Sequence, residues 1–143
     1  MSDFDGNVLY FYNPHSKKYD VFDITWLQIG TYKSVPLQRT ELKANRSSNN
    51  SLHRKTSPNH KSTISFTTHP MHLIEMEKLR SFINNHYILK VQRKVKVKYW
   101  CDETMSYYKG EMYMPDATYT YLDINTAKKD ILYGSTEYEL IQY

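Results

Sequence analysis

The chain has 143 residues, of which 40% are apolar and 15% aromatic, enough for one hydrophobic core and typical of a folded, β-rich domain. It contains one cysteine, so an internal disulfide and a cysteine zinc site are excluded. No apolar run reaches the roughly 18 residues of a membrane span. The acidic start, MSDFDG, lacks the positive region of a signal peptide. We therefore expect a single domain over residues 1–143, made in a cytoplasm and without a membrane anchor.

The net charge of +4 is unevenly distributed along the chain. Residues 1–31 hold two lysines against four aspartates, and residues 32–98 hold fourteen basic residues against three glutamates. Residues 99–143 hold three lysines against eight acidic residues. A basic middle between acidic ends indicates either nucleic acid or a chain with the opposite pattern, such as a second copy, as the partner.

The first 28 residues predict a β-hairpin. Residues 7–12 (NVLYFY) are aromatic and β-branched, residues 13–16 (NPHS) have turn chemistry, and residues 19–29 read as the return strand. Gly30 ends this second run. We treat residues 1–28 as an N-terminal hairpin extension of the domain.

Two further strands are expected on either side of a long polar segment. Residues 33–43 predict a strand that Pro36 places at a sheet edge, and residues 61–68 alternate polar and apolar side chains. The two strands are expected to pair with each other. Residues 45–60, which are polar and basic, would then form an arm loop between them.

The clearest helix signal lies at residues 71–84. Its apolar residues recur every three or four positions, at Leu73, Met76, Leu79, Phe82 and Ile83. Pro70 stands where a proline in the first helical turn would stand, with Thr68 or His69 as the cap.

The remaining segments are mostly strands. In residues 91–101 the side chains expected to face the core are those of Val91, Val95, Val97, Tyr99 and Cys101. Residues 107–114 would return as a hairpin with Gly110 at a bulge, and strands follow at 117–123 and 137–143, with a loop at 124–134 between them. The order predicts a mainly β (α+β) sandwich or barrel with one flanking helix.

Signatures of chemistry are lacking in the sequence. The six histidines are scattered, and although His69 and His72 could meet on one helical turn, a third metal ligand has no evident source. No phosphate-binding glycine loop or nucleophile motif occurs, and Cys101 is expected to be a buried thiol. We therefore predict no enzyme, no metal and no cofactor.

Nucleic-acid binding is the alternative function. The basic residues of segments 39–61 and 90–98 could contact phosphates, and tyrosine-rich strands could stack on bases. No RNA-binding sequence motif or zinc knuckle supports this alternative.

Several segments together resemble small tail proteins of bacteriophages, including tail-tube subunits and related baseplate proteins. They are TISFT at 63–67, HLIEMEKLRSFI at 72–83 and YKGEMYMPD at 108–116, preceded by the polar segment and followed by a tyrosine strand. The pattern is most similar to a group of short prophage tail proteins.

The resemblance implies a tail-tube-like core over residues 29–143 and a structural role in a phage tail or baseplate. The protein would be a tube subunit, a tube-initiating or distal ring protein, or a tail-completion protein. It would be made in the host cytoplasm and reside in the virion, in a homo-oligomeric ring or bound to other tail proteins. DNA would only pass through. The resemblance transfers no catalytic residue.

The resemblance also implies that residues 45–60 reach a neighbouring subunit. The arm residues expected to make contact are Arg46, Asn49, His53, Arg54 and Lys55. A second basic surface is expected on one strand face, formed by Lys94, Lys96 and Lys98. The acidic residues expected to complement these surfaces are Asp123, Glu137 and Glu139.

Overall fold

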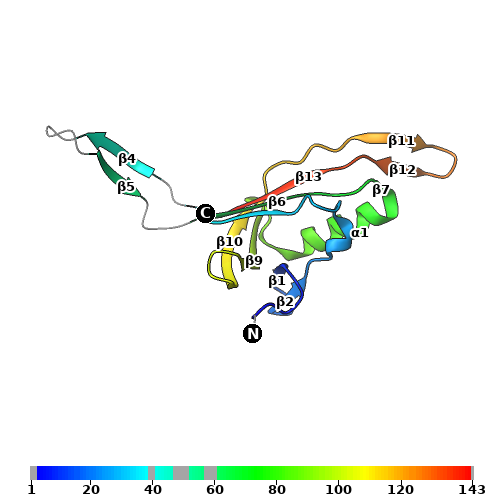
Figure 1. Cartoon of the computed structure of the whole chain (residues 1–143). Coiled ribbons are helices and arrows are strands. Elements are labelled where there is room, and N and C mark those ends of the chain that lie inside the picture. The colour runs from blue at the N-terminus through cyan, green and yellow to red at the C-terminus, as the bar shows by residue number, and fades with distance from the viewer. Residues whose placement is uncertain (1–2, 39–40, 47–51, 57–60, 143) are drawn as a thin grey trace.

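The computed structural model describes residues 3–38, 41–46, 52–56 and 61–142, and one large antiparallel sheet dominates it (Figure 1). The strands of this sheet are β1 (Leu9–Asn13), β2 (Lys18–Val21), β3 (Lys33–Gln38), β6 (Lys61–Thr67), β8 (Tyr87–Leu89), β9 (Lys94–Cys101), β10 (Ser106–Tyr113) and β13 (Glu137–Gln142). Their order is β2-β1-β9-β10-β13-β6-β3, and β8 also pairs with β9. The expected pairing of the strands at 33–43 and 61–68 is confirmed by the β3–β6 register, in which Ser34 lies opposite Ile64.

Two smaller sheets and one helix complete the described structure. Strands β11 (Tyr121–Asn125), β12 (Asp130–Tyr133) and β7 (Met71–His72) form a three-stranded sheet in the order β11-β12-β7. Strands β4 (Glu41–Arg46) and β5 (Leu52–Thr56) form a separate hairpin, which stands away from the main sheet in Figure 1. Helix α1 (Leu73–His86) packs against the main sheet. The prediction of a mainly β fold with one flanking helix is confirmed.

The core lies between α1 and the inner face of the main sheet. Along β9 the side chains of Val95, Val97, Tyr99 and Cys101 are buried, as the alternating pattern predicted. Helix α1 contributes the buried residues Met76, Leu79, Ile83 and His86. Aromatic rings join the two layers in a contact cluster formed by Phe11, Phe22, Trp26, Phe66 and Phe82.

The N-terminal hairpin is shorter than expected and belongs to the main sheet. Strand β2 ends at Val21, and a 3₁₀ helix, η1 (Ile24–Trp26), replaces the expected strand up to residue 29. The reason is local, because the Asp23 carboxylate accepts a hydrogen bond from the Thr25 amide at 2.9 Å and so favours a turn. Since β1 pairs with both β2 and β9, this N-terminal hairpin is joined to the rest of the main sheet.

The start of α1 also differs from the prediction. Pro70 does not begin the helix, because Met71 and His72 pair with β12 as strand β7. The helix begins at Leu73, whose amide donates to the Asp130 carboxylate at 3.3 Å. Asp130, which is distant in sequence, thus binds the first amide of the helix, whereas Thr68 or His69 was predicted to cap it.

Three further predictions in the second half of the chain are wrong. Val91 is 99% exposed, because it lies in the turn between β8 and β9 rather than in the strand. Gly110 is not at a bulge, since the β9–β10 register is continuous, and a Cβ there would lie 2.9 Å from the Gln142 side-chain nitrogen. The expected loop at 124–134 contains the end of β11 and the whole of β12.

Replacing a helix residue of the core tests this packing. The Ile83→Ala variant is expected to lower the free energy of unfolding by about 2–5 kcal/mol, because Ile83 is fully buried and truncation leaves a cavity. Ile74→Ala is the matched control on the same helix; Ile74 is 67% exposed, and its loss should change stability by less than about 0.5 kcal/mol. Urea unfolding followed by circular dichroism measures both. Equal effects would contradict the assigned helix face.

Candidate interaction surfaces

The outer face of the main sheet carries lysines that lie over tyrosine rings. The Nζ atom of Lys98 is 4.8 Å from the ring centre of Tyr10 and 4.9 Å from that of Tyr107. Lys96 lies 5.1 Å from the ring centre of Tyr12 in the same way. Lys109 lies over Tyr19, also at 5.1 Å. We call this surface, formed by β2, β1, β9 and β10, the lysine–tyrosine face.

The N-terminal segment is bound to the edge of the lysine–tyrosine face. The hydroxyls of Tyr10 and Tyr107 each donate to the Asp5 carboxylate at 2.5 Å, and Tyr107 also donates to the Asn7 carbonyl. The hydrogen bond from Tyr10 is the largest cause that lowers the pKa of the Asp5 carboxyl, and the one from Tyr107 is the next. Burial and the same carboxylate raise the pKa of Tyr10. The carboxylate therefore places a negative charge close to Lys98.

This geometry bears on the expected basic strand face. Lys94, Lys96 and Lys98 do share one face, as predicted, and all three are half-buried. Lys94 pairs with Glu111 at 2.8 Å. Since ammonium groups already lie over the rings of Tyr10, Tyr12 and Tyr107, these rings are poorly placed to stack on bases.

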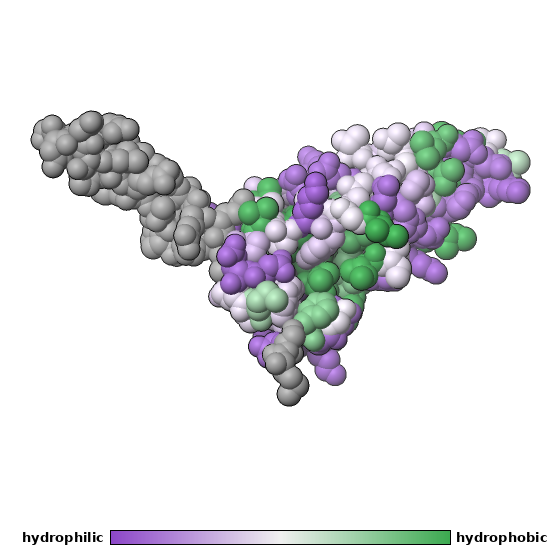
Figure 2. Space-filling view, viewed as in Figure 1, coloured by the Kyte–Doolittle hydropathy of each residue, from purple (hydrophilic) through white to green (hydrophobic). Residues whose placement is uncertain are grey.

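The expected acidic residues lie on two different sheets. Glu137 and Glu139 are exposed on β13, on the outer face of the main sheet, whereas Asp123 is exposed on β11. Strand β11 also exposes the apolar side chains of Leu122 and Ile124, and Figure 2 shows green patches over the β11–β12 hairpin. The role of the three acidic residues as complements in a second copy stays a prediction.

The basic arm is a hairpin in the structure. Instead of a loop over 45–60, strands β4 and β5 pair with each other, with Asn45 opposite His53 and Ala44 opposite Arg54. Arg46 ends β4, and His53, Arg54 and Lys55 lie on β5. Asn49 lies outside the described residues. The sequence analysis missed β4 and β5 because strands can pair through their backbones without an apolar pattern of side chains.

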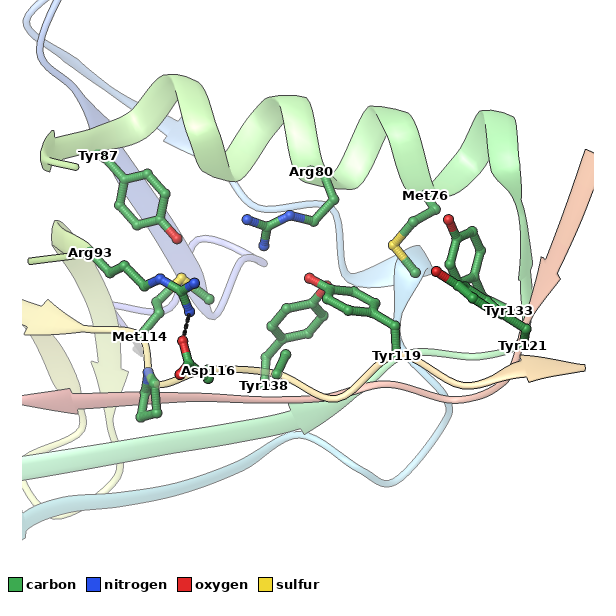
Figure 3. Close-up of a pocket in the computed structure, with 12 residues that line it drawn as sticks. Met76, Arg80, Tyr87, Arg93, Met114, Asp116, Tyr119, Tyr121, Tyr133 and Tyr138 are labelled. Atoms are coloured by element: carbon green, nitrogen blue, oxygen red, sulfur yellow. Dashed lines mark hydrogen bonds and ion pairs between the residues drawn. The ribbon is translucent and has the colours of Figure 1, made fainter. Parts of the chain in front are cut away.

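A groove runs between α1 and the chain that follows β10. It has a volume of about 660 Å³ and is open on one side. Figure 3 shows Arg80 and Met76 extending into it from α1, opposite the rings of Tyr119 and Tyr138. The Tyr138 hydroxyl donates to that of Tyr119 at 3.1 Å. We call this feature the Arg80 groove.

Two arginines in the Arg80 groove differ in their partners. Arg93 is paired with Asp116 at 2.5 Å. Arg80 donates to the Asn84 side-chain oxygen at 3.1 Å. Burial acts to lower the pKa of Arg80, but the surrounding tyrosine oxygens, including that of Tyr119, outweigh it and raise the pKa. The groove therefore holds a strongly cationic guanidinium within an aromatic wall.

Both ends of α1 are fixed by carboxylates, which hold this wall of the groove in place. At the C-terminal end the buried His86 ring contacts the Asp20 carboxylate at 2.7 Å through one nitrogen and the Phe82 carbonyl at 2.5 Å through the other. At the N-terminal end His72 contacts Asp130 at 2.7 Å. The hydrogen bond with His86 lowers the pKa of Asp20. Partial burial acts to raise the pKa of Asp130, but the hydrogen bonds with the His72 ring and the Leu73 amide outweigh it and lower this pKa.

The histidines considered as metal ligands have other contacts. One His69 ring nitrogen lies 3.0 Å from the Thr25 carbonyl and the other 2.8 Å from the Pro70 carbonyl. Within residues 3–38, 41–46, 52–56 and 61–142, no group of three or more potential ligands is placed to hold a metal ion. No helix in the same ranges is long and apolar enough to cross a membrane. The Cys101 thiol is buried, as predicted.

The Arg80 groove was not predicted from the sequence. Its walls come from several segments far apart in the sequence, among them those of Arg80, Tyr119 and Tyr138, which share no spacing pattern. The sequence held two weak signals for such a groove. Arg80 follows Met76 by one helical turn and so lies beside the apolar stripe, and tyrosines occur at positions 119 and 121. Neither signal indicates that the two segments meet.

These features define an antiparallel β protein with a flanking helix and a separate two-stranded hairpin. The chain belongs to DUF6711, a family of unknown function, which it matches over residues 10–143. The matched region includes β2, α1 and most of β1. No curated protein matches its sequence.

A solved structure shares the fold. It is a chain from the tail of an empty GTA particle, computed with helical refinement in C6 symmetry. The alignment has a TM-score of 0.51 and 8% sequence identity, and it covers 100% of this chain and 95% of that chain. At this level of identity the likeness shows a common fold alone.

The contact between His86 and Asp20, which joins the end of α1 to β2, predicts that the stability of the fold depends on pH. A carboxyl whose pKa is lower in the folded than in the unfolded chain stabilises the fold above its unfolded pKa of about 3.9, and this contribution is lost as the pH falls. Asp20→Asn should therefore be less stable than the parent chain at pH 5, and the difference should narrow towards pH 2. Urea unfolding across this range measures it.

The control for this experiment is Asp123→Asn, the same substitution on exposed β11. It should change the unfolding free energy by less than about 0.5 kcal/mol. A difference between Asp20→Asn and the parent that stays constant from pH 5 to pH 2 would show that the Asp20 carboxylate does not act as described.

Proposed function

We propose that this chain is a structural subunit of a phage-type tail, which assembles with copies of itself or with other tail proteins and carries out no chemistry. The observation that supports this most is the shared fold, over the full length of the chain, with a chain from the tail of a GTA particle. Because that tail has C6 symmetry and was refined as a helix, a six-membered ring that stacks into a tube is the arrangement we propose. The protein would then reside in the virion.

The β4–β5 hairpin would provide one contact between subunits. It forms a sheet of its own with only two strands. A two-stranded sheet is marginally stable in water, so contact with another chain would stabilise it. Its basic residues, which include Arg46, Arg54 and Lys55, would face acidic side chains of the neighbour, for which Glu137 and Glu139 are candidates. Exposed strand edges such as that of β11 would add backbone pairing.

Removing the hairpin tests this function. In the variant, a short Gly/Asn turn replaces residues 39–60 and joins β3 directly to β6. The parent chain is expected to form rings or tubes as its concentration rises. The variant should stay monomeric with an unchanged circular dichroism spectrum, because the main sheet does not include β4 or β5. Light scattering and negative-stain electron microscopy measure the difference.

A labelled oligonucleotide added in parallel distinguishes the alternative function. A parent chain that stays monomeric and binds the oligonucleotide with a steep salt dependence would contradict the tail-subunit proposal and favour nucleic-acid binding. Rings that persist in the hairpin variant would contradict the role of β4 and β5 while leaving self-assembly in place.

A further inference from the structure

Arg80 is a cation without a described counter-charge in a groove that also holds tyrosines, methionines and the Arg93–Asp116 pair. None of the ion pairs in the described part of the chain includes Arg80, whereas Arg93 in the same groove is paired with Asp116. A guanidinium has five N–H donors and forms its strongest hydrogen bonds with carboxylates. Within the described part of the chain, Arg80 is hydrogen-bonded to the neutral side chains of Asn84, Tyr87 and Tyr138 and is paired with no carboxylate.

The walls of the Arg80 groove fit an apolar side chain beside a carboxylate. Met76 extends into the groove from α1 and Met114 lies near Arg93, while the rings of Tyr119, Tyr133 and Tyr138 also line the groove. Methionine and tyrosine are frequent at the centres of protein interfaces, and thioether groups pack well on aromatic rings. Since the groove is open along one side, it suits a projecting segment of protein.

The turn between β9 and β10 has the complementary composition. Its residues Asp102, Glu103, Thr104 and Met105 are all exposed, and the Met105 side chain is 60% exposed. The strands on both sides are paired up to Cys101 and Ser106, so the turn projects from the end of a paired hairpin. It presents two carboxylates followed by a flexible apolar side chain.

The turn cannot fill the groove of its own chain. The groove includes Arg93 and Met114, which flank β9 and β10 at one end of this hairpin, and the turn lies at the other end. Eight residues of β9 separate them, a distance of about 25 Å along an extended strand. Any occupancy of the groove by this turn therefore requires a second copy.

We propose that the Arg80 groove binds the Asp102–Met105 turn of a second copy of this chain, with the Arg80 guanidinium paired to a turn carboxylate and the Met105 side chain packed against the groove tyrosines. Because each copy carries the turn and the groove in different places, the contact is heterologous and generates a ring when its rotation closes. The inference rests on the proposed function in taking the chain to self-assemble, and it names a contact separate from the β4–β5 hairpin.

Charge reversal tests the pairing in the full-length chain. Arg80→Glu, and separately the double variant Asp102→Arg/Glu103→Arg, should each weaken self-association by about tenfold or more, as expected when one partner of a central charged pair is reversed. A chain that carries all three substitutions restores opposite charges in every contact and should regain most of the association. Sedimentation over a concentration series measures the dissociation constants.

Two controls match the charge changes. Lys78→Glu reverses an exposed charge on the same helix, and Asp3→Arg reverses an exposed acid in the N-terminal segment. Both should associate much more tightly than the groove and turn variants. Circular dichroism and urea unfolding show whether Arg80→Glu is folded. If it is not, the milder Arg80→Gln should still weaken association beyond the effect of Lys78→Glu.

A cysteine pair tests proximity independently. Glu103→Cys combined with Tyr119→Cys should form disulfides between copies under mild oxidation, whereas Glu103→Cys combined with Ile29→Cys should not, because Ile29 is fully exposed outside the groove. A parent chain that assembles while the first pair stays unlinked, or while Arg80→Glu behaves like Lys78→Glu, would overturn this inference alone. A parent chain that does not assemble, together with a first cysteine pair that stays unlinked, would overturn it together with the proposed function.

Discussion

The packing of α1 on the inner face of the main sheet is the contact on which the rest of the structure depends. Leu79 and Ile83 are fully buried there, and the Phe82 ring meets Phe11 and Phe22 from the N-terminal hairpin. Burying one face of an antiparallel sheet leaves the other face free to be polar. The same helix supplies one wall of the Arg80 groove, so this groove exists only when the core is formed.

Basic side chains have different partners on the two faces of the main sheet. On the outer face, lysines from neighbouring strands lie over tyrosine rings or pair with acids, as Lys98 and Lys94 do. These contacts keep long side chains ordered while their ammonium groups remain near water. On the helix side, Arg80 is surrounded by phenol oxygens that favour its charge without neutralising it. A carboxylate from another molecule would therefore alter the surroundings of Arg80 more than those of the outer-face lysines.

Elements with a local pattern could be predicted from the sequence. The two-residue alternation of β9 identified Val95, Val97, Tyr99 and Cys101 as core, and the spacing of apolar residues located α1 to within two residues at each end. The fold class followed from the order of these elements. Where the alternation met a turn, as at Val91, the pattern alone could not show that the strand begins three residues later.

Features that depend on contacts between distant residues were missed. Asp130 binds the start of α1 from 57 positions away, and no pattern near Leu73 indicates it. The Arg80 groove is assembled from α1, the segment after β10, the last strand and several other parts of the chain, so only the tertiary fold brings its residues together. The β4–β5 hairpin was missed for another reason, because its polar composition is equally typical of a loop.

The β9–β10 hairpin has chemically different ends, and this gives the molecule a direction. One end is an acidic turn with an exposed methionine, and the other opens towards two arginines and several tyrosines. Copies joined through such ends would all point the same way around a ring. A closed ring would leave neither surface free. An incomplete ring would expose an acidic, methionine-bearing turn at one end and a cationic, aromatic groove at the other, so that each further copy could add in one orientation alone.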